Sequence, residues 1–247
     1  MNAEPADQIR LLDVQDLDVR LQQLAYKRTS LPEHAEIETL GKDLVQLRDL
    51  LVAAQTEESD CAREQTKAEQ DVDQVRRRAT RDQQRLDSGA VTSPKDLTGL
   101  QHEIASLAKR QGDLEDVVLE VMERREAAQA RVAELTERVA SLQAKSDDAT
   151  ARRDAAFREL DDEAAAVTKE REVVSASVPA DLLKLYDRLR GQGGGVGAAK
   201  LYARTCQGCR QELAITELSE IRAAARNAVV RCENCHRILV RTAESGL

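Results

Sequence analysis

The sequence predicts a mainly α-helical protein, in which a long antiparallel coiled-coil hairpin precedes a small C-terminal module with four cysteines and short β-strands. Three observations predict this fold. Apolar residues recur at alternating steps of three and four over most of the chain, a turn near residue 90 divides the pattern into two arms, and two Cys-x2-Cys pairs stand near the C-terminus. We expect the hairpin over residues 1–178 and the second domain over residues 179–247.

Composition agrees with long helices. The 247 residues include one Phe, three Tyr and no Trp, and 33% of them are charged. Compact cores depend on large aromatic side chains, so a globule of this length is disfavoured. Disorder is the competing interpretation for so charged a chain. The unbroken heptad pattern argues against disorder over roughly residues 6–177.

The first arm begins with Val14, Leu17, Leu21 and Leu24 on one helical face. A break is predicted at residues 29–32, because Pro32 lacks an N–H donor and restricts the residue before it. The heptad phase also shifts there. We therefore expect a short helix, a break, and a second helix over about residues 33–87.

The hairpin tip is predicted at residues 88–93. Gly89 can adopt the left-handed conformation that ends a helix. Ser93 is suited to cap the next helix, with Pro94 in its first turn and Asp96 three residues after the cap. The second arm should run over about residues 94–175. The tip that partners could meet comprises Ser93, Pro94, Lys95 and Asp96.

Folding the arms about this tip pairs residue i with about residue 183 − i, within one heptad. Glu58 then lies opposite Arg125, and we expect an ion pair that sets the register of the seam. Tyr26 falls opposite Phe157. The oligomeric state stays open, because the second arm carries further apolar residues outside the seam: Val117, Leu119 and Met122.

A short amphipathic helix is predicted from Pro179 to Arg190, ended by Gly191. Five glycines then occur within residues 191–197, which is typical of a flexible link or wide turn. A phosphate-binding loop is the alternative. It is disfavoured because no strand precedes the glycines and no Gly-Lys-Ser/Thr follows them.

The four cysteines form two Cys-x2-Cys pairs separated by 22 residues. This arrangement suits zinc, which takes four thiolates tetrahedrally. Alternating branched residues around the pairs, at 200–204, 229–231 and 237–241, predict the short strands of a zinc ribbon, with a helical segment near 218–226. The predicted ligands of one structural zinc ion per chain are Cys206, Cys209, Cys232 and Cys235.

Other roles for the thiols and histidines are weaker. Two unrelated reduced pairs, or a thioredoxin-like redox pair, are the alternatives to zinc, and the βαβ pattern that the latter needs is missing. Four cysteine ligands leave no open coordination position, so the zinc should be structural and not catalytic. His236 would be a superfluous ligand, and Cys61 reads as a small buried residue of the seam.

Charge is distributed unevenly. Residues 200–247 hold eight Lys/Arg against five Glu, a net charge of +3, whereas residues 1–199 carry −11 of the total of −8. An acidic stalk repels a phosphate backbone, so any nucleic-acid contact is expected in the ribbon. The candidate nucleic-acid or partner contacts are Arg204, Arg210, Arg231, Arg237 and Arg241. No signal peptide or membrane span is visible, and we expect a cytoplasmic protein.

The layout resembles a bacterial family in which a long coiled-coil hairpin precedes a four-cysteine zinc ribbon, often described as nucleic-acid-binding. The likeness covers nearly the whole chain and is carried by residues 93–104, 179–190 and 206–239. Family members usually have glycine directly after the last cysteine, where this chain has His236. Some relatives act as chaperone-like adaptors in flagellar assembly and transcription-factor stability, and another contacts secretion and transcription components. The resemblance therefore implies adaptor or scaffold work with protein partners.

Two functions remain in consideration. The first is a non-enzymatic adaptor that presents the stalk, the tip and the ribbon to proteins. The second is a nucleic-acid binder that acts through the ribbon. Four thiolates with zinc contribute −2, which leaves the ribbon only about +1, and Tyr202 is the sole aromatic residue there for base stacking. An enzyme is not expected, since no acid–base pair or activated nucleophile is visible.

Overall fold

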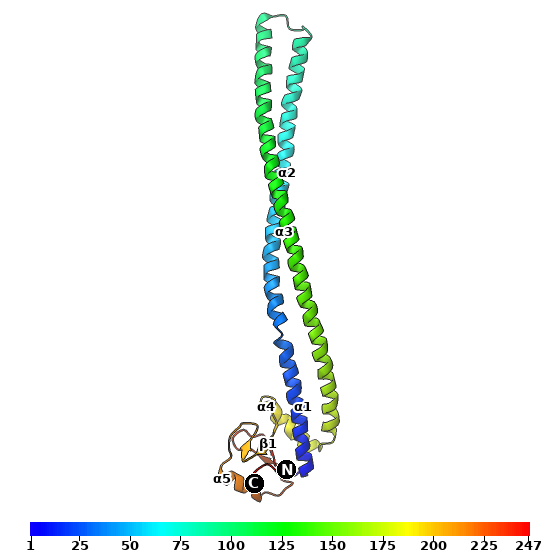
Figure 1. Cartoon of the computed structure of the whole chain (residues 1–247), viewed down its shortest axis with the longest axis vertical. Coiled ribbons are helices and arrows are strands. Elements are labelled where there is room, and N and C mark those ends of the chain that lie inside the picture. The colour runs from blue at the N-terminus through cyan, green and yellow to red at the C-terminus, as the bar shows by residue number, and fades with distance from the viewer. The chain divides into compact units, whose positions relative to one another are not determined.

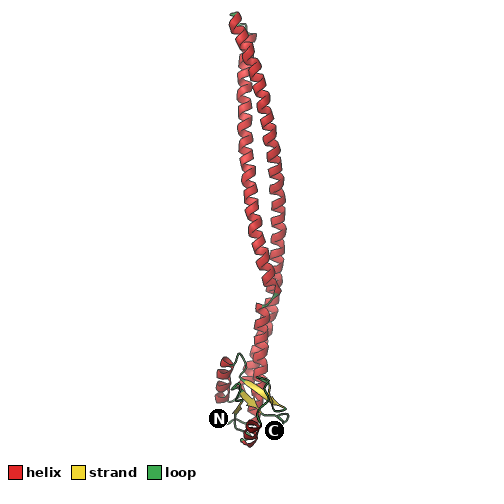
Figure 2. Cartoon of the chain, turned by 90° about the vertical axis from the view of Figure 1, so that its left-hand side faces the viewer, coloured by secondary structure: helices red, strands yellow, loops and turns green.

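The computed structural model describes residues 1–247. Helices account for most of the chain, and a four-stranded sheet lies near the C-terminus (Figures 1 and 2). The elements in chain order are α1 (Pro5–Thr29), α2 (Pro32–Asp87), α3 (Pro94–Ala176), α4 (Ala180–Gln192), β1 (Ala198–Tyr202), β2 (Thr205–Cys206), α5 (Ile215–Ala223), β3 (Val230–Arg231) and β4 (Ile238–Val240).

The chain forms two compact units. The first comprises Met1–His34 and Thr150–Leu247, and the second comprises Ala35–Ala149. This division differs from the boundary at residue 178 that the sequence predicts. The reason is that α1, the end of α3 and α4 pack with the sheet, so the C-terminal strands share a core with both ends of the hairpin. No helix combines the length and the apolar character needed to cross a bilayer.

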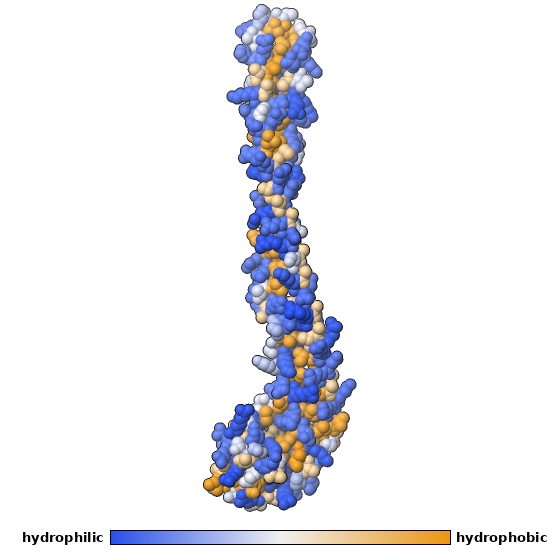
Figure 3. Space-filling view, in the orientation of Figure 1, coloured by the Kyte–Doolittle hydropathy of each residue, from blue (hydrophilic) through white to orange (hydrophobic).

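The second unit is the antiparallel pair formed by α2 and the first part of α3, which lie side by side in Figures 1 and 2. Its core is one line of buried side chains, including Leu47, Ala54 and Leu135, because each helix offers only a narrow apolar stripe. Polar residues cover most of the helical surface in Figure 3, and apolar residues show between them. Such a seam is the geometry that a seven-residue repeat specifies.

The tip follows from local backbone chemistry. Gly89 has φ +66°, which a residue with a side chain rarely adopts. The carbonyl of Ser93 accepts a hydrogen bond from Leu97 N at 2.9 Å and so closes the first turn of α3. Pro94 is the first residue of that helix, where its missing N–H costs nothing.

Glu58 and Arg125 contact each other across the seam. Arg125 Nε donates to Glu58 Oε1 at 3.1 Å, and Arg125 Nη1 donates to Gln65 Oε1 at 3.1 Å. The side chains of Arg125 and Glu58 are 35% and 26% exposed, so solvent screens the pair and it stabilises the hairpin only modestly. Its more important effect is alignment, because only one register brings these two residues together.

Replacing both Glu58 and Arg125 with leucine should raise the thermal midpoint measured by circular dichroism. Two leucines would continue the apolar seam, while the lost ion pair is partly solvated. The hydrogen bond from Arg125 lowers the pKa of Glu58, so the pair stabilises the fold above the ordinary value of 4.5 and is lost as the pH falls through the lowered pKa. The advantage of the double variant should therefore grow in acid.

The matched control is the exposed pair of Glu64 and Arg124, whose side chains are 54% and 50% exposed. Leucines placed there bury little apolar surface, so no rise in midpoint is expected. An equal rise for both double variants would show that the seam position has no special role.

Phe157 does not meet Tyr26, contrary to the predicted register. Tyr26 is 72% exposed, and the ring of Phe157 instead lies 4.0 Å from the guanidinium carbon of Arg28 and 5.7 Å from the ring of His34. The reason is that α1 ends three residues after Tyr26, and the break brings His34 and Arg28 against the phenyl ring. The two aromatic residues therefore do not align the helices.

The sheet has the strand order β2-β1-β4-β3. Strands β1 and β4 are parallel, with Ala199 opposite Leu239, and the other two pairs are antiparallel. The isolated bridge between Asn2 and Ala228 joins the N-terminal residues to the chain before β3. Both termini thus lie in the first unit, near the sheet (Figure 1). The predicted end of the short helix at Gly191 is wrong, because α4 continues to Gln192.

Candidate metal centre

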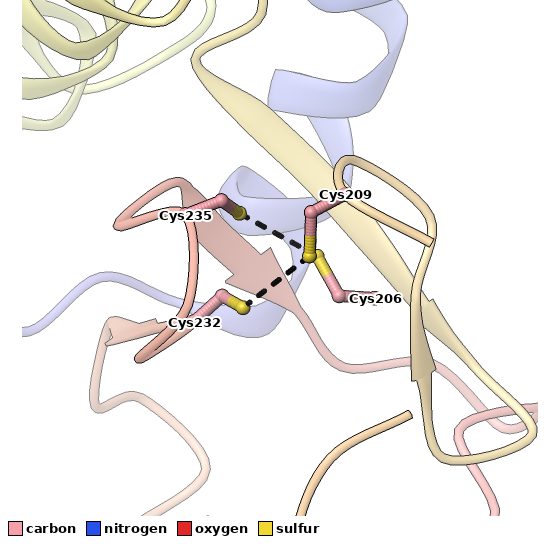
Figure 4. A group of neighbouring side chains, drawn as sticks. All are labelled: Cys206, Cys209, Cys232 and Cys235. Carbon is pink, nitrogen blue, oxygen red and sulfur yellow. Dashed lines mark hydrogen bonds between the residues drawn. The ribbon is translucent and has the colours of Figure 1, made fainter. Parts of the chain in front are cut away.

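Two knuckles of matching geometry carry the four cysteines. The first begins at Cys206, the last residue of β2, and the second joins β3 to β4. In the first knuckle, Arg210 N donates to Cys206 O at 2.7 Å, and in the second, His236 N donates to Cys232 O at 2.8 Å. These backbone bonds bend each Cys-x2-Cys segment so that both of its sulfurs face the other knuckle (Figure 4).

The sulfur positions fit one tetrahedral ion. All four Sγ atoms lie within 4.8 Å of one another. The Sγ atoms of Cys206 and Cys235 are 3.8 Å apart, and those of Cys209 and Cys232 are 3.9 Å apart. Zinc–sulfur bonds of about 2.3 Å place tetrahedral sulfurs about 3.8 Å apart. The donor set and spacing therefore suit zinc, and the ribbon places all four sequence-predicted ligands together.

Burial controls the thiol chemistry. Burial raises the pKa of Cys206 and of Cys232 above the ordinary value of 9.0. Burial also opposes ionisation of Cys235, but hydrogen bonds, first among them one from the backbone of Arg237, outweigh it and lower the pKa of that thiol. Because zinc binds thiolates, metal binding here must displace protons, and the affinity for zinc falls as the pH falls.

Both residues that follow the knuckles have a left-handed backbone. Arg210 has φ +58° and His236 has φ +59°. This conformation costs an L-residue about 1–2 kcal/mol and costs glycine almost nothing. The glycine that family members usually carry at the position of His236 thus has a physical explanation, and the histidine keeps the same knuckle at an energetic cost.

The substitution His236→Gly should stabilise the zinc-loaded protein by about 0.5–1 kcal/mol, because relief of the left-handed strain exceeds the entropy that glycine gains in the unfolded chain. The change in unfolding free energy is measured by hydrogen exchange of the β4 amides at increasing denaturant concentrations. His236→Ala is the control, since alanine keeps the strain and should give no gain. A loss of stability for the glycine variant would mean that the imidazole makes a stabilising contact.

Arg237 and Arg241 donate hydrogen bonds inside the fold, a role that the sequence did not predict. Arg237 donates to three backbone carbonyl groups, those of Gly193 (2.7 Å), Val196 (3.0 Å) and Gly208 (3.2 Å). It thereby ties the glycine-rich link to the first knuckle. The alternation that predicts strands gave no sign of this role, because the acceptors lie far away in sequence.

Arg241 holds the end of α5. Its guanidinium donates to five backbone carbonyls at 2.7–3.1 Å, which belong to Ile221, Ala224, Ala225, Arg226 and Ala228. Helix C-termini leave carbonyls without partners, and a cation satisfies them well. Arg204, Arg210 and Arg231 are exposed, whereas Arg237 and Arg241 are half-buried.

Two residues outside the sequence prediction hold the centre in place. The buried carboxylate of Glu217 accepts from Glu233 N at 3.1 Å and so joins α5 to the second knuckle. Gln15 Oε1 accepts from Gly197 N at 2.7 Å, and Gln15 Nε2 donates to Gly195 O at 3.1 Å. In the sequence, the only sign of these roles was a polar residue on an otherwise apolar helical face.

The largest such group surrounds Asp18, whose side chain is 2% exposed. Asp18 accepts hydrogen bonds from Arg171 Nε (2.7 Å), Arg190 Nη1 (2.6 Å) and the hydroxyl of Tyr186 (2.6 Å). Burial first, and then the bond to Asp18, raise the pKa of Tyr186, so the phenol keeps its proton and remains a donor. The group joins α1, α3 and α4.

Comparisons with known proteins agree with this architecture. A family profile described as "CT398-like coiled coil hairpin domain" matches residues 14–194, and one described as "C4-type zinc ribbon domain" matches residues 205–239. The uncharacterized protein Rv2229c of Mycobacterium tuberculosis is 37% identical over 241 residues, which cover 98% of each chain.

Two solved structures resemble the chain along its length. A protein of Mycobacterium smegmatis is 35% identical, with a TM-score of 0.87, and the match covers 98% of this chain and 100% of that one. CT398 of Chlamydia trachomatis has a TM-score of 0.69 at 17% identity, with coverage of 96% and 98%. The latter likeness concerns the fold alone.

Proposed function

The chain belongs to the CT398-like coiled-coil hairpin family, and from that premise we propose that it is a non-enzymatic adaptor of the cytoplasm, which presents its helical hairpin and a structural zinc ribbon to protein partners. One observation carries the proposal. The metal centre is closed by four cysteines, and two of the arginines around it spend their donors on backbone carbonyls. The ribbon therefore has no open metal position for chemistry, and two of its arginines have fewer donors left for a phosphate backbone.

The hairpin supplies exposed surface for binding partners instead of a catalytic site. Several large apolar side chains stand outside the seam, and a partner helix could cover them. Val45 and Val52 are 58% and 61% exposed on α2, and Val117, Leu119 and Met122 are 44%, 58% and 38% exposed on α3. A single zinc ion per chain would keep the ribbon folded and take no part in a reaction.

Photo-crosslinking in living cells tests the adaptor proposal. A photoreactive amino acid is placed at Val117 or Met122 on α3, at Lys95 beside the tip, and at Tyr202 on the ribbon. Reproducible crosslinks from the hairpin positions to one or a few proteins would support it, if the crosslinks from Val117 are lost when Leu119 and Met122 are changed to serine. Crosslinks to nucleic acid alone would overturn it.

Nucleic-acid binding through the ribbon is the second candidate. It is favoured by the exposed side chains of Arg204, Arg210 and Arg231 and by Tyr202, which is 49% exposed with Lys200 Nζ 5.5 Å from its ring centre. The test titrates the full-length, zinc-loaded chain with single-stranded RNA over a range of salt. Affinity that falls steeply with salt, and falls again in a Tyr202→Ala variant, would favour this candidate.

A further inference from the structure

A groove of about 550 Å³ lies in the first unit, and none of the four cysteines lines it. It is bounded by the first turns of α1, the end of α5 and the chain that follows β4. Arg241 builds one wall, because its five carbonyl acceptors fold residues 221–228 around the guanidinium. The volume is within the range of about 300–1,000 Å³ that ligand-binding clefts occupy.

The lining of the groove is apolar with a positive rim. Ile9 and Leu247, which are 45% and 38% exposed, contribute apolar surface. Arg222 and Arg226 line it as well; both are exposed, and their guanidinium groups make no hydrogen bond or ion pair within the chain. Arg241 has carbonyl partners only and no carboxylate. No Asp or Glu side chain lines the groove, so the guanidinium groups of Arg222 and Arg226 have no carboxylate partner there.

We propose that this groove binds an extended acidic segment of a partner protein, with an apolar side chain against Ile9 and Leu247 and carboxylates on Arg222 and Arg226. The inference rests on the proposed adaptor function and gives it a partner chemistry. Charge complementarity selects an acidic ligand. The groove has no aromatic side chain on which a base could stack, so an acidic peptide fits it better than a nucleic acid.

The direct test measures binding of a short fluorescent peptide, in which single leucines alternate with pairs of glutamates, to the full-length zinc-loaded chain by fluorescence anisotropy. Two companion peptides replace the glutamates with glutamines or the leucines with serines. We expect a Kd on the order of 10–100 µM for the acidic peptide and weaker binding for both companions. The double variant Arg222→Glu/Arg226→Glu should weaken binding about tenfold or more.

The matched control is Lys184→Glu/Arg188→Glu, which changes the net charge equally at exposed positions of α4 outside the groove. It should leave the affinity within about twofold. Circular dichroism and zinc content show whether each variant is folded. A third variant, Ile9→Ser, tests the apolar contact at an exposed position and should weaken binding of the leucine peptide only.

Three results would overturn the proposal: no binding of the acidic peptide, equal binding of the glutamine peptide, or equal losses in the groove and control variants. Single-stranded RNA that binds more tightly and displaces the peptide would assign the arginines to nucleic acid. Failure here is distinguishable from failure of the adaptor function, because the crosslinks from the hairpin helices do not depend on Arg222 or Arg226.

Discussion

Removal of zinc is expected to unfold the ribbon core and to leave the hairpin helices folded. The core beneath the knuckles is small, and Cys206 and Cys232 are two of its fully buried members, along with Leu201 and Leu239. Structural zinc contributes about 10–16 kcal/mol of apparent binding free energy at neutral pH, whereas a core of this size supplies only about 3–5 kcal/mol. Zinc binding therefore contributes more free energy to the folding of the ribbon than the packing of its core does.

Hydrogen exchange measures this effect residue by residue. After chelation, the amides of β1 and β4 should lose protection, while those of α2 between Ala35 and Asp87 should keep it, because they belong to the second compact unit. Elemental analysis should find one zinc ion per chain in the native protein and none in a Cys232→Ser variant. Protection of β4 that survives chelation would refute the prediction.

Cys61 offers the matched control for loss of a thiol. It is buried at 6% exposure in the α2 seam, and its sulfur is not among the four that cluster. Cys61→Ala preserves a small apolar side chain and should keep one zinc ion and full protection of the ribbon. A loss of zinc in this variant would show that the four-cysteine site is not the metal centre.

Removal of the Asp18 carboxylate is expected to destabilise the first unit by about 3–5 kcal/mol, because removing one partner of a buried ion pair leaves the other charge without a partner. An Asp18→Ala variant would leave the guanidinium groups of Arg171 and Arg190 and the hydroxyl of the fully buried Tyr186 without their shared acceptor. Urea denaturation, followed by hydrogen exchange of α4 and β1, measures the loss.

Asp187 is the matched control for this prediction. It accepts a single hydrogen bond from Arg171 Nη2 at 3.2 Å, and its side chain is 45% exposed. Asp187→Ala removes the same chemical group from solvent-screened surroundings and should cost no more than about 1 kcal/mol. Equal losses of unfolding free energy for the two variants would mean that burial does not increase the contribution of Asp18 to stability.

Local patterns were sufficient to predict much of this molecule. The heptad repeat, Gly89 and Pro94 predict a hairpin whose helices end at Asp87 and begin again at Pro94. The two Cys-x2-Cys pairs predict a single cluster of four sulfurs. These features are readable because each depends on residues that are close together in sequence, or on a ligand geometry that admits few arrangements.

Such patterns could not predict the contacts that join the ribbon to the hairpin. Gln15 and Asp18 bind groups more than 150 positions away, and Met1 O accepts a hydrogen bond from Val229 N. The five-carbonyl role of Arg241 and the exposure of Tyr26 were equally hidden. A heptad position indicates that a residue faces a neighbouring helix, but it does not identify the residue that it contacts. Long-range hydrogen bonds depend on where separate elements meet. Periodicity and cysteine spacing thus determine the hairpin and the ligand set, whereas the buried polar contacts and the arginine-rimmed groove exist only once distant segments have packed.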